Sequence, residues 1–110
     1  MSPTPYKTDR DRWKQLDFMN QMGNIGSEVG RTLSAKRRGA DFWPALTRAL
    51  DLFDATLMSL VRTHPHRAKE VNRAKEQFLQ AVFIADDPGI ETYFMRFATA
   101  ARLRRSTLNA

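Results

Sequence analysis

The stretch from residue 16 to residue 38, LDFMNQMGNIGSEVGRTLSAKRR, limits the possible folds of this chain more than any other. Its large apolar side chains recur every three or four residues, which places them in one stripe along a helix: Phe18, Met22, Ile25, Val29 and Leu33. Three glycines lie on the flank of that stripe: Gly23, Gly26 and Gly30. Because each glycine costs a helix roughly 1 kcal/mol relative to alanine, we expect a neighbouring helix to pack closely against this helix-packing flank.

The rest of the apolar pattern predicts three more helices and extends the first one back to residue 9. In each of them, apolar side chains recur at helical spacing: Leu46, Leu50, Phe53, Leu57 and Leu60; Val71, Ala74, Phe78 and Val82; Ile90, Phe94, Phe97 and Ala101. We expect helices over residues 9–38, 41–62, 65–84 and 88–105, with Asp41 as N-cap of the second and Gly39 ending the first. No alternating β-branched run predicts a strand. Short connections favour antiparallel neighbours, so the expected fold class is all-α, an antiparallel up-down-up-down four-helix bundle.

The length of 110 residues is typical of one domain. We expect a flexible N-terminal tail over residues 1–8, the four-helix bundle over residues 9–105 and a frayed C-terminus over residues 106–110. No apolar run approaches the roughly 18 residues of a membrane span, which predicts no membrane association. The first residues lack the apolar segment of a secretory signal, and the chain contains no cysteine. Both features favour a cytoplasmic location.

The formal net charge of +6 is concentrated by the expected topology. The start of the first helix, the end of the second, the start of the third and the end of the fourth would meet at one end. We call this the cationic end; it comprises Arg10, Arg12, Lys14, Arg62, Arg67, Lys69, Arg73, Arg102, Arg104 and Arg105. The carboxylates opposing it are Asp9, Asp11, Asp17 and Glu70. A concentrated positive surface neutralises several phosphates at once, so the pattern predicts nucleic-acid binding without sequence specificity.

A secondary basic cluster, Lys36, Arg37 and Arg38, lies at the opposite end among Asp41, Asp86, Asp87 and Glu91. Cations at helix ends also stabilise the helix dipole, so a solvated face without a partner is the alternative interpretation of both groups. Trp13 and Tyr6 are candidates for base stacking at the cationic end, although an aromatic residue at that spacing more often packs at the rim of the core.

An enzyme is not predicted. His64 and His66 flank a proline without further metal ligands nearby, and Ser27 and Ser34 have no adjacent histidine to activate them. No glycine-rich phosphate loop is present. We therefore expect no catalytic residue, no metal and no cofactor. The alternative function class is a homo-oligomeric protein-interaction adaptor that binds an acidic protein partner without nucleic acid.

The run from residue 24 to residue 31, NIGSEVGR, is followed by Phe42, Leu46, Ala49 and Leu50. This pattern resembles the four-helix-bundle family that includes proteins encoded in 23S ribosomal RNA intervening sequences and the accessory variability protein of diversity-generating retroelements. In that family an Asn-Ile-small-Glu-Gly-aromatic-Gly-Arg stretch precedes a helix with an Ala-Leu core pair. The matching residues are Asn24, Ile25, Gly30, Arg31, Ala49 and Leu50. The glutamate stands one place later, at Glu28, and Val29 replaces the aromatic residue. The resemblance covers residues 13–60 by motif and the rest by the number of helices.

The resemblance implies a partner and an assembly state. Members of the family are basic four-helix bundles that form ring-like homo-oligomers, commonly pentamers. The retroelement member associates with a reverse transcriptase and with structured template RNA, and it supports mutagenic cDNA synthesis without catalysing it. For this chain the resemblance implies a non-catalytic accessory protein that binds nucleic acid, RNA rather than DNA, together with a reverse transcriptase.

Overall fold

The computed structural model describes residues 7–108, and this part of the chain is all-helical, without strands. Five helices follow one another: α1 (Arg10–Lys14), α2 (Phe18–Arg37), α3 (Trp43–Thr63), α4 (Pro65–Phe83) and α5 (Pro88–Leu108). The all-α prediction is confirmed. The prediction of a flexible tail over residues 1–8 lies mostly outside the described residues, as does the prediction for residues 109 and 110.

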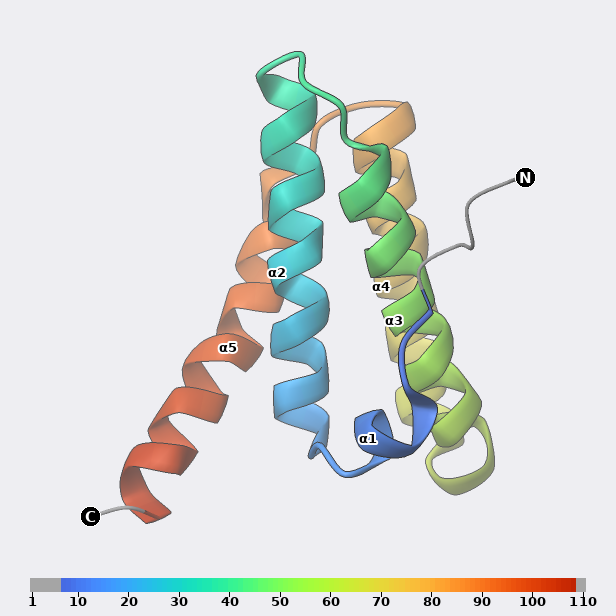
Figure 1. Cartoon of the computed structure of the whole chain (residues 1–110), viewed down its shortest axis with the longest axis vertical. Helices are drawn as coiled ribbons and strands as arrows, with labels where there is room; N and C mark the ends of the chain where they lie inside the picture. Colours follow the sequence, from blue (N-terminus) through green and yellow to red (C-terminus); the bar gives the residue numbers. More distant parts are fainter. Residues whose placement is uncertain (1–6, 109–110) are drawn as a thin grey trace.

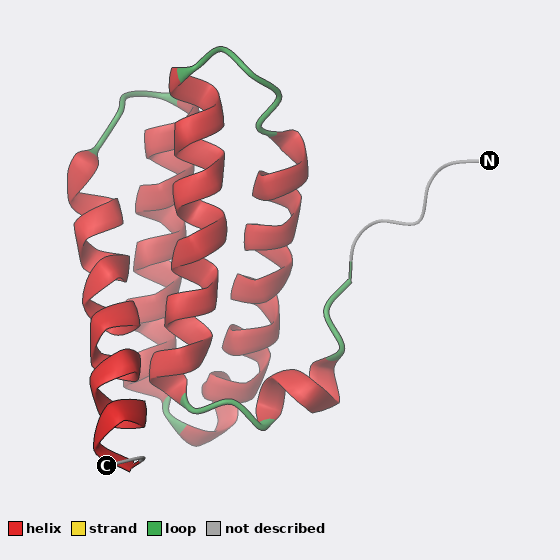
Figure 2. Ribbon diagram, turned by 60° about the vertical axis from the view of Figure 1, so that its left-hand side comes forward, coloured by secondary structure: helices red, strands yellow, loops and turns green. Residues whose placement is uncertain are grey.

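The four long helices lie side by side around a common core, as Figures 1 and 2 show. The α2–α3 and α4–α5 connections are at one end of the molecule, and the α3–α4 connection is at the other, where α1 lies across the helix ends. Helix α2 is central, because it packs against α3, α4 and α5. This arrangement explains why the apolar stripe along α2 is buried from Met22 to Leu33.

The predicted stripe on α2 is the heart of the core. Met22, Ile25, Val29 and Leu33 are all buried, and Phe18 is partly buried at the edge. The other helices cover the stripe with aromatic side chains. The ring of Phe53 lies 6.0 Å from the ring of Phe78 and 5.8 Å from that of Phe94. Separations of this size are typical of favourable aromatic pairs.

The glycine flank is covered by α5 over two of its three positions. A methyl group added at Gly23 would lie 3.4 Å from the Cα of Ala98, and one added at Gly26 would lie only 2.7 Å from the Cβ of Phe94. Only a residue without a side chain permits that approach at Gly26. At Gly30 no atom lies within 4 Å of an added methyl group, so the prediction of close packing is wrong there.

The first expected helix, over residues 9–38, is in fact two helices. The chain leaves the helical conformation between Lys14 and Phe18, and Asp17 becomes the N-cap of α2 by accepting the backbone N–H of Asn20 at 2.8 Å. Asp9 caps α1 in the same way. The break turns α1 across the end of the molecule, where the buried Trp13 donates an indole hydrogen bond of 2.9 Å to Thr56 of α3.

The other helix ends differ from the expected ones by a few residues. Gly39 has a φ of +70°, which suits a glycine that ends a helix. The N-cap of α3 is Phe42 and not Asp41. Asp41 lies in the preceding turn, where its carboxylate accepts the backbone N–H of Trp43 at 3.1 Å. Helix α5 continues to Leu108, so the frayed segment does not begin after Arg105.

Candidate nucleic-acid interface

The end of α5 diverges from α2 at the end of the molecule that holds α1 (Figure 1), and two arginine side chains of α5 reach back to the start of α2. A guanidinium nitrogen of Arg104 lies 3.2 Å from the carboxylate of Asp17. Arg105 donates a 2.7 Å hydrogen bond to the side chain of Asn20. The pKa of Asp17 is lowered, chiefly because its carboxylate accepts the backbone N–H of Asn20, with a smaller contribution from the charges of Arg104 and Arg105.

The start of α4 joins the same end. The guanidinium carbon of Arg67 lies 4.3 Å from the centre of the Phe18 ring at the start of α2, a cation–π contact. Nearby in α4, the carboxylate of Glu70 accepts a 2.8 Å hydrogen bond from the Tyr93 hydroxyl of α5. Glu70 is thus engaged by a neutral donor and forms no salt bridge within residues 7–108. The starts of α2 and α4 and the end of α5 therefore form one surface.

Arg10 does not belong to this surface, which corrects its assignment to the cationic end. One of its guanidinium nitrogens lies 3.0 Å from the carboxylate of Asp51 and 3.3 Å from that of Asp54, both near the middle of α3. The backbone N–H of Thr8 also donates to Asp51. Partial burial raises the pKa of Asp51, but the hydrogen bonds from Thr8 and Arg10 outweigh it, and the net pKa is below the ordinary value. Two carboxylates therefore neutralise Arg10.

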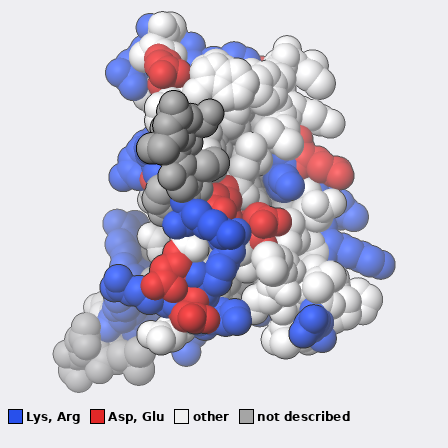
Figure 3. Space-filling view, turned by 45° about the vertical axis from the view of Figure 1, so that its right-hand side comes forward, with Lys and Arg blue, Asp and Glu red and all other residues white. Residues whose placement is uncertain are grey.

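Most of the other predicted cations are exposed and free of carboxylates. In the part of the chain that the structure describes, no salt bridge involves Arg12, Lys14, Arg62, Arg67, Lys69, Arg73, Arg102 or Arg105. Figure 3 shows one face of the molecule, on which cationic side chains gather in the lower part with acidic side chains among them. The positive charge is thus concentrated at this end but not uniform. Exposed guanidinium and ammonium groups without a carboxylate partner are available to bind phosphate oxygens.

Trp13 cannot stack on bases in this structure. Its side chain is 6% exposed, and its indole N–H is already bonded to Thr56. The packing interpretation of Trp13 is therefore the correct one. Tyr6, the second stacking candidate, lies outside the described residues.

The secondary basic cluster disperses into three separate contacts. Lys36 donates to the backbone carbonyls of Ala81 and Val82 at the end of α4. Arg37 lies 2.9 Å from Asp86 and 2.6 Å from Glu91, and these hydrogen bonds raise its pKa. Arg38 turns back along α2 and donates to the carbonyl of Ser34 at 3.3 Å. Within residues 7–108 only Arg37 of the three forms salt bridges, and the three side chains contact different partners, so they do not form one continuous anion-binding surface.

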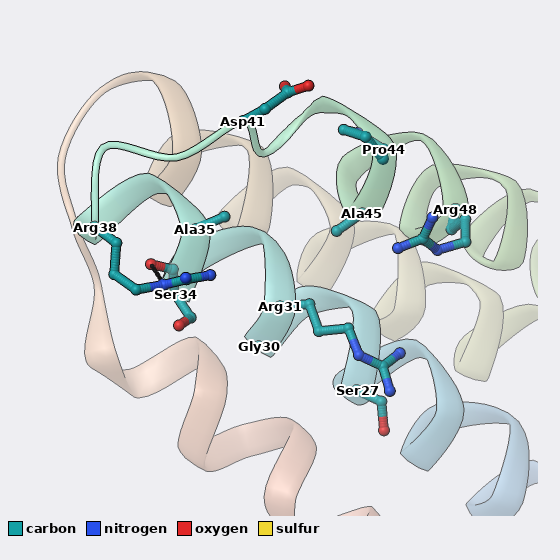
Figure 4. Close-up of a pocket in the computed structure, with 10 residues that line it drawn as sticks. All are labelled: Ser27, Gly30, Arg31, Ser34, Ala35, Arg38, Asp41, Pro44, Ala45 and Arg48. Atoms are coloured by element: carbon teal, nitrogen blue, oxygen red, sulfur yellow. Dashed lines mark hydrogen bonds between the residues drawn. The ribbon is translucent and has the colours of Figure 1, made fainter.

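Two arginines that the charge pattern of the sequence did not assign to a binding surface, Arg31 and Arg48, lie between α2 and α3. Both contact Glu28, whose side chain is only 11% exposed: Arg31 at 2.5 Å and Arg48 at 3.1 Å. Figure 4 shows them beside an open pocket of about 600 Å³ that Arg38 also lines. The spacing of Glu28 and Arg31 on one helix is a recognisable ion-pair signal. Arg48 is 20 residues away from Glu28 in the sequence, and no local pattern connects them.

The described residues contain no group of histidines, cysteines or carboxylates that could hold a metal ion. His64 lies at the α3–α4 connection, where its Nδ1 is 3.0 Å from the Thr63 hydroxyl. Nor do residues 7–108 include a helix whose length and apolarity would suffice to cross a lipid bilayer.

Comparison of the chain with protein-family models, with curated proteins and with solved structures finds no match. Fold and charge distribution therefore define the class: an all-helical protein with exposed, largely unpaired cations at one end.

Proposed function

We propose that this protein is a non-catalytic accessory protein that binds nucleic acid, structured RNA in preference to DNA, at its cationic end. The proposal includes an antiparallel up-down-up-down four-helix bundle as its architecture. The observation that carries it is the contact of Arg67 from α4, and of Arg104 and Arg105 from α5, with the start of α2, which gathers cations from two helices on one surface.

Binding of this kind is electrostatic. Each phosphate that a lysine or arginine neutralises releases condensed counterions, and this release drives association without reading the bases. Arginine suits the role because its planar guanidinium donates two parallel hydrogen bonds to a phosphate. Arg62, Lys69 and Arg102 lie on three different helices and have no salt bridge within residues 7–108, so they are free to contact successive phosphates.

The resemblance of the sequence to retroelement accessory proteins supports a reverse transcriptase as protein partner and a ring-like homo-oligomer, a pentamer in the commonest case. The composition without cysteine supports a cytoplasmic location. An exposed apolar face on α5 supports self-association: Met95 and Leu103 are 65% and 64% exposed and line an apolar surface groove with Thr99 and Ala100. Exposed apolar patches of this kind mark interaction sites.

A salt titration of RNA binding tests the proposal. The affinity of the wild-type protein for a structured RNA is expected to fall steeply with salt, with log K against log salt sloping by about −0.7 to −0.9 per phosphate contacted. Replacing Arg62, Lys69 and Arg102 together with glutamine should weaken binding at least roughly tenfold and flatten the slope by about 2 to 3.

The matched control removes three cations located elsewhere, Lys7→Gln, Lys75→Gln and Arg96→Gln, none of which forms a salt bridge within the described chain. It lowers the net charge by the same amount and should change affinity much less. Equal losses in the two triple variants, or a flat salt dependence, would remove the cationic end as the binding surface.

A protein-interaction adaptor with an acidic protein partner is the second candidate. The exposed aromatic residues Trp43 and Phe83, whose rings lie 5.9 Å apart at the α2–α3 end of the molecule, favour a protein contact. Absorbance of the purified protein at 260 nm separates the two candidates, because only a nucleic-acid-binding protein is expected to carry nucleic acid through purification at low salt.

A further inference from the structure

The pocket between α2 and α3 lies away from the cationic end, toward the α2–α3 connection (Figure 4). Gly30 and Ala45 form part of its lining, and no atom lies within 4 Å of the position that a Cβ at Gly30 would take. Three arginines surround it: Arg31 and Arg38 from α2 and its C-terminal end, and Arg48 from α3. No other pocket described in this molecule is lined by three cations.

Glu28 holds two of these arginines in place. Its almost buried carboxylate contacts Nη1 of Arg31 with one oxygen and Nε of Arg48 with the other. A guanidinium has five N–H donors, and each contact occupies only part of them. One carboxylate balances one of the two cations, so the group keeps positive charge and a fixed orientation. Positioned donors of this kind bind an anion without first losing side-chain entropy.

Arg38 completes the site from the other side. Its Nε donates to the carbonyl of Ser34, which leaves the two terminal nitrogens free. In Figure 4 the guanidinium groups of Arg38 and Arg48 point toward the space between them from opposite sides of the pocket. Asp41 also lines the pocket, with one carboxylate oxygen 3.1 Å from the N–H of Trp43. With Glu28 and Asp41 both counted, the three arginines still leave a positive balance.

We propose that this pocket binds the phosphate group of a phosphorylated molecule through Arg31, Arg38 and Arg48. A phosphate monoester carries a charge near −2 and three terminal oxygens, so it accepts donors from several directions at once. The Ser34 hydroxyl lines the same pocket and adds a neutral donor. The volume of about 600 Å³ exceeds what one phosphate fills and leaves room for the rest of the molecule. The cationic end contributes no residue to this site, so either proposal can fail without the other.

Calorimetric titration with inorganic phosphate tests the site on the full chain. We expect one phosphate per chain, with a dissociation constant that rises at least fivefold in Arg38→Gln. Gly30→Leu should abolish binding, because a leucine side chain at this position occupies space in the pocket. The melting temperature of this variant should not fall, which distinguishes loss of the site from loss of the fold. The matched control is Arg96→Gln, which removes an exposed cation of α5 that belongs neither to this pocket nor to the cationic end, and it should leave phosphate affinity unchanged. Unchanged affinity in both pocket variants, or an equal loss in Arg96→Gln, overturns the proposal.

The same variants identify the source of the phosphate. A short oligonucleotide with a 5′-phosphate is compared with the same oligonucleotide ending in a 5′-hydroxyl. If the phosphate raises affinity in the wild-type protein but not in Gly30→Leu, the ligand is the end of a nucleic acid. If the two oligonucleotides bind equally while inorganic phosphate still requires the pocket, the ligand is a small phosphorylated molecule.

Discussion

Gly26 and Gly30 stand one helical turn apart on α2, yet they meet opposite surroundings. At Gly26 the backbone of α2 approaches Phe94 so closely that no side chain fits between them. At Gly30 the space is open, and it forms part of the arginine-lined pocket. The free-energy cost of a glycine in a helix is therefore offset at Gly26 by close packing against Phe94, whereas at Gly30 no core contact offsets it. This contrast separates a structural glycine from one that keeps a site accessible.

Alanine at these two positions should change stability in opposite directions. Gly26→Ala forces Phe94 to shift and is expected to lower the free energy of unfolding by about 1–3 kcal/mol. Gly30→Ala replaces a helical glycine at a position where the added methyl group meets no neighbour, and it should raise the free energy of unfolding by about 0.5–1 kcal/mol. Urea unfolding followed by circular dichroism measures both. Changes of the same sign would contradict the close approach of α5 to Gly26.

Among the elements, α1 shows most clearly how a short helix is held in place. It has only five residues, too few to be stable alone, and it depends on contacts with α3. Trp13 supplies the buried contact to Thr56, and Arg10 supplies the charged contact to Asp51. Because hydrogen bonds from Thr8 and, to a smaller extent, from Arg10 lower the pKa of Asp51, the docking of this segment on α3 should depend on pH.

The pKa of Asp51 in the folded protein lies below the ordinary value of 3.8. A carboxylate with a lowered pKa stabilises the fold above its ordinary pKa, and this contribution is lost as the pH falls through the lower folded value. The free energy of unfolding should therefore decrease from about pH 5 to pH 3, in part through Asp51.

Asp51→Asn should cost about 1–2 kcal/mol at neutral pH and should remove part of that acid dependence. Asp54→Asn is the control, because the Asp54 side chain is 61% exposed and such ion pairs contribute little. Urea unfolding at a series of pH values measures both variants. An acid dependence identical to that of the wild type in Asp51→Asn would rule out the docking contact.

The helix bodies could be predicted from the sequence because burial follows the 3.6-residue period, as Met22, Ile25 and Val29 show. The break before α2 could not be predicted from this periodicity. Asp17 is compatible with a helix interior, and what favours its capping conformation is the docking of Trp13 on Thr56, 43 residues away. At the candidate site, the pairing of Arg10 with Asp51 could not be predicted either, since the two residues are 41 positions apart in the sequence. Clusters of cations were visible in the sequence, but their neutralising partners were not.

On the scale of the whole molecule, exposed apolar side chains lie on the faces of α3 and α5, apart from the Trp43–Phe83 pair at the end of the molecule. On α5, Met95 and Leu103 line a groove, whereas on α3 Met58 and Val61 are equally exposed, at 62% and 63%. The α5 face also adjoins the glycine flank of α2, since Met95 lines a second pocket with Gly23 and Gly26. We therefore expect the proposed self-association to use α5 rather than α3.

Light scattering of purified protein tests this assignment. The wild-type protein should have the mass of an oligomer, and Met95→Gln with Leu103→Gln should weaken association by about 3 kcal/mol, roughly 100-fold. Met58→Gln with Val61→Gln removes the same kind of surface from α3 and should leave the mass unchanged. A monomeric wild-type protein, or dissociation caused by the α3 pair alone, would contradict the assignment.

Thr8 hydrogen-bonds to Asp51, so the chain enters the fold along the flank of α3 and not at the tip where phosphates are proposed to bind. The neighbouring Lys7 is exposed, which makes it a convenient attachment point for a dye or a surface linker. A reporter placed there would leave the polynucleotide-facing side unobstructed. One placed after α5 would crowd the arginines at the end of that helix. For immobilised binding assays, coupling through position 7 is therefore the better orientation.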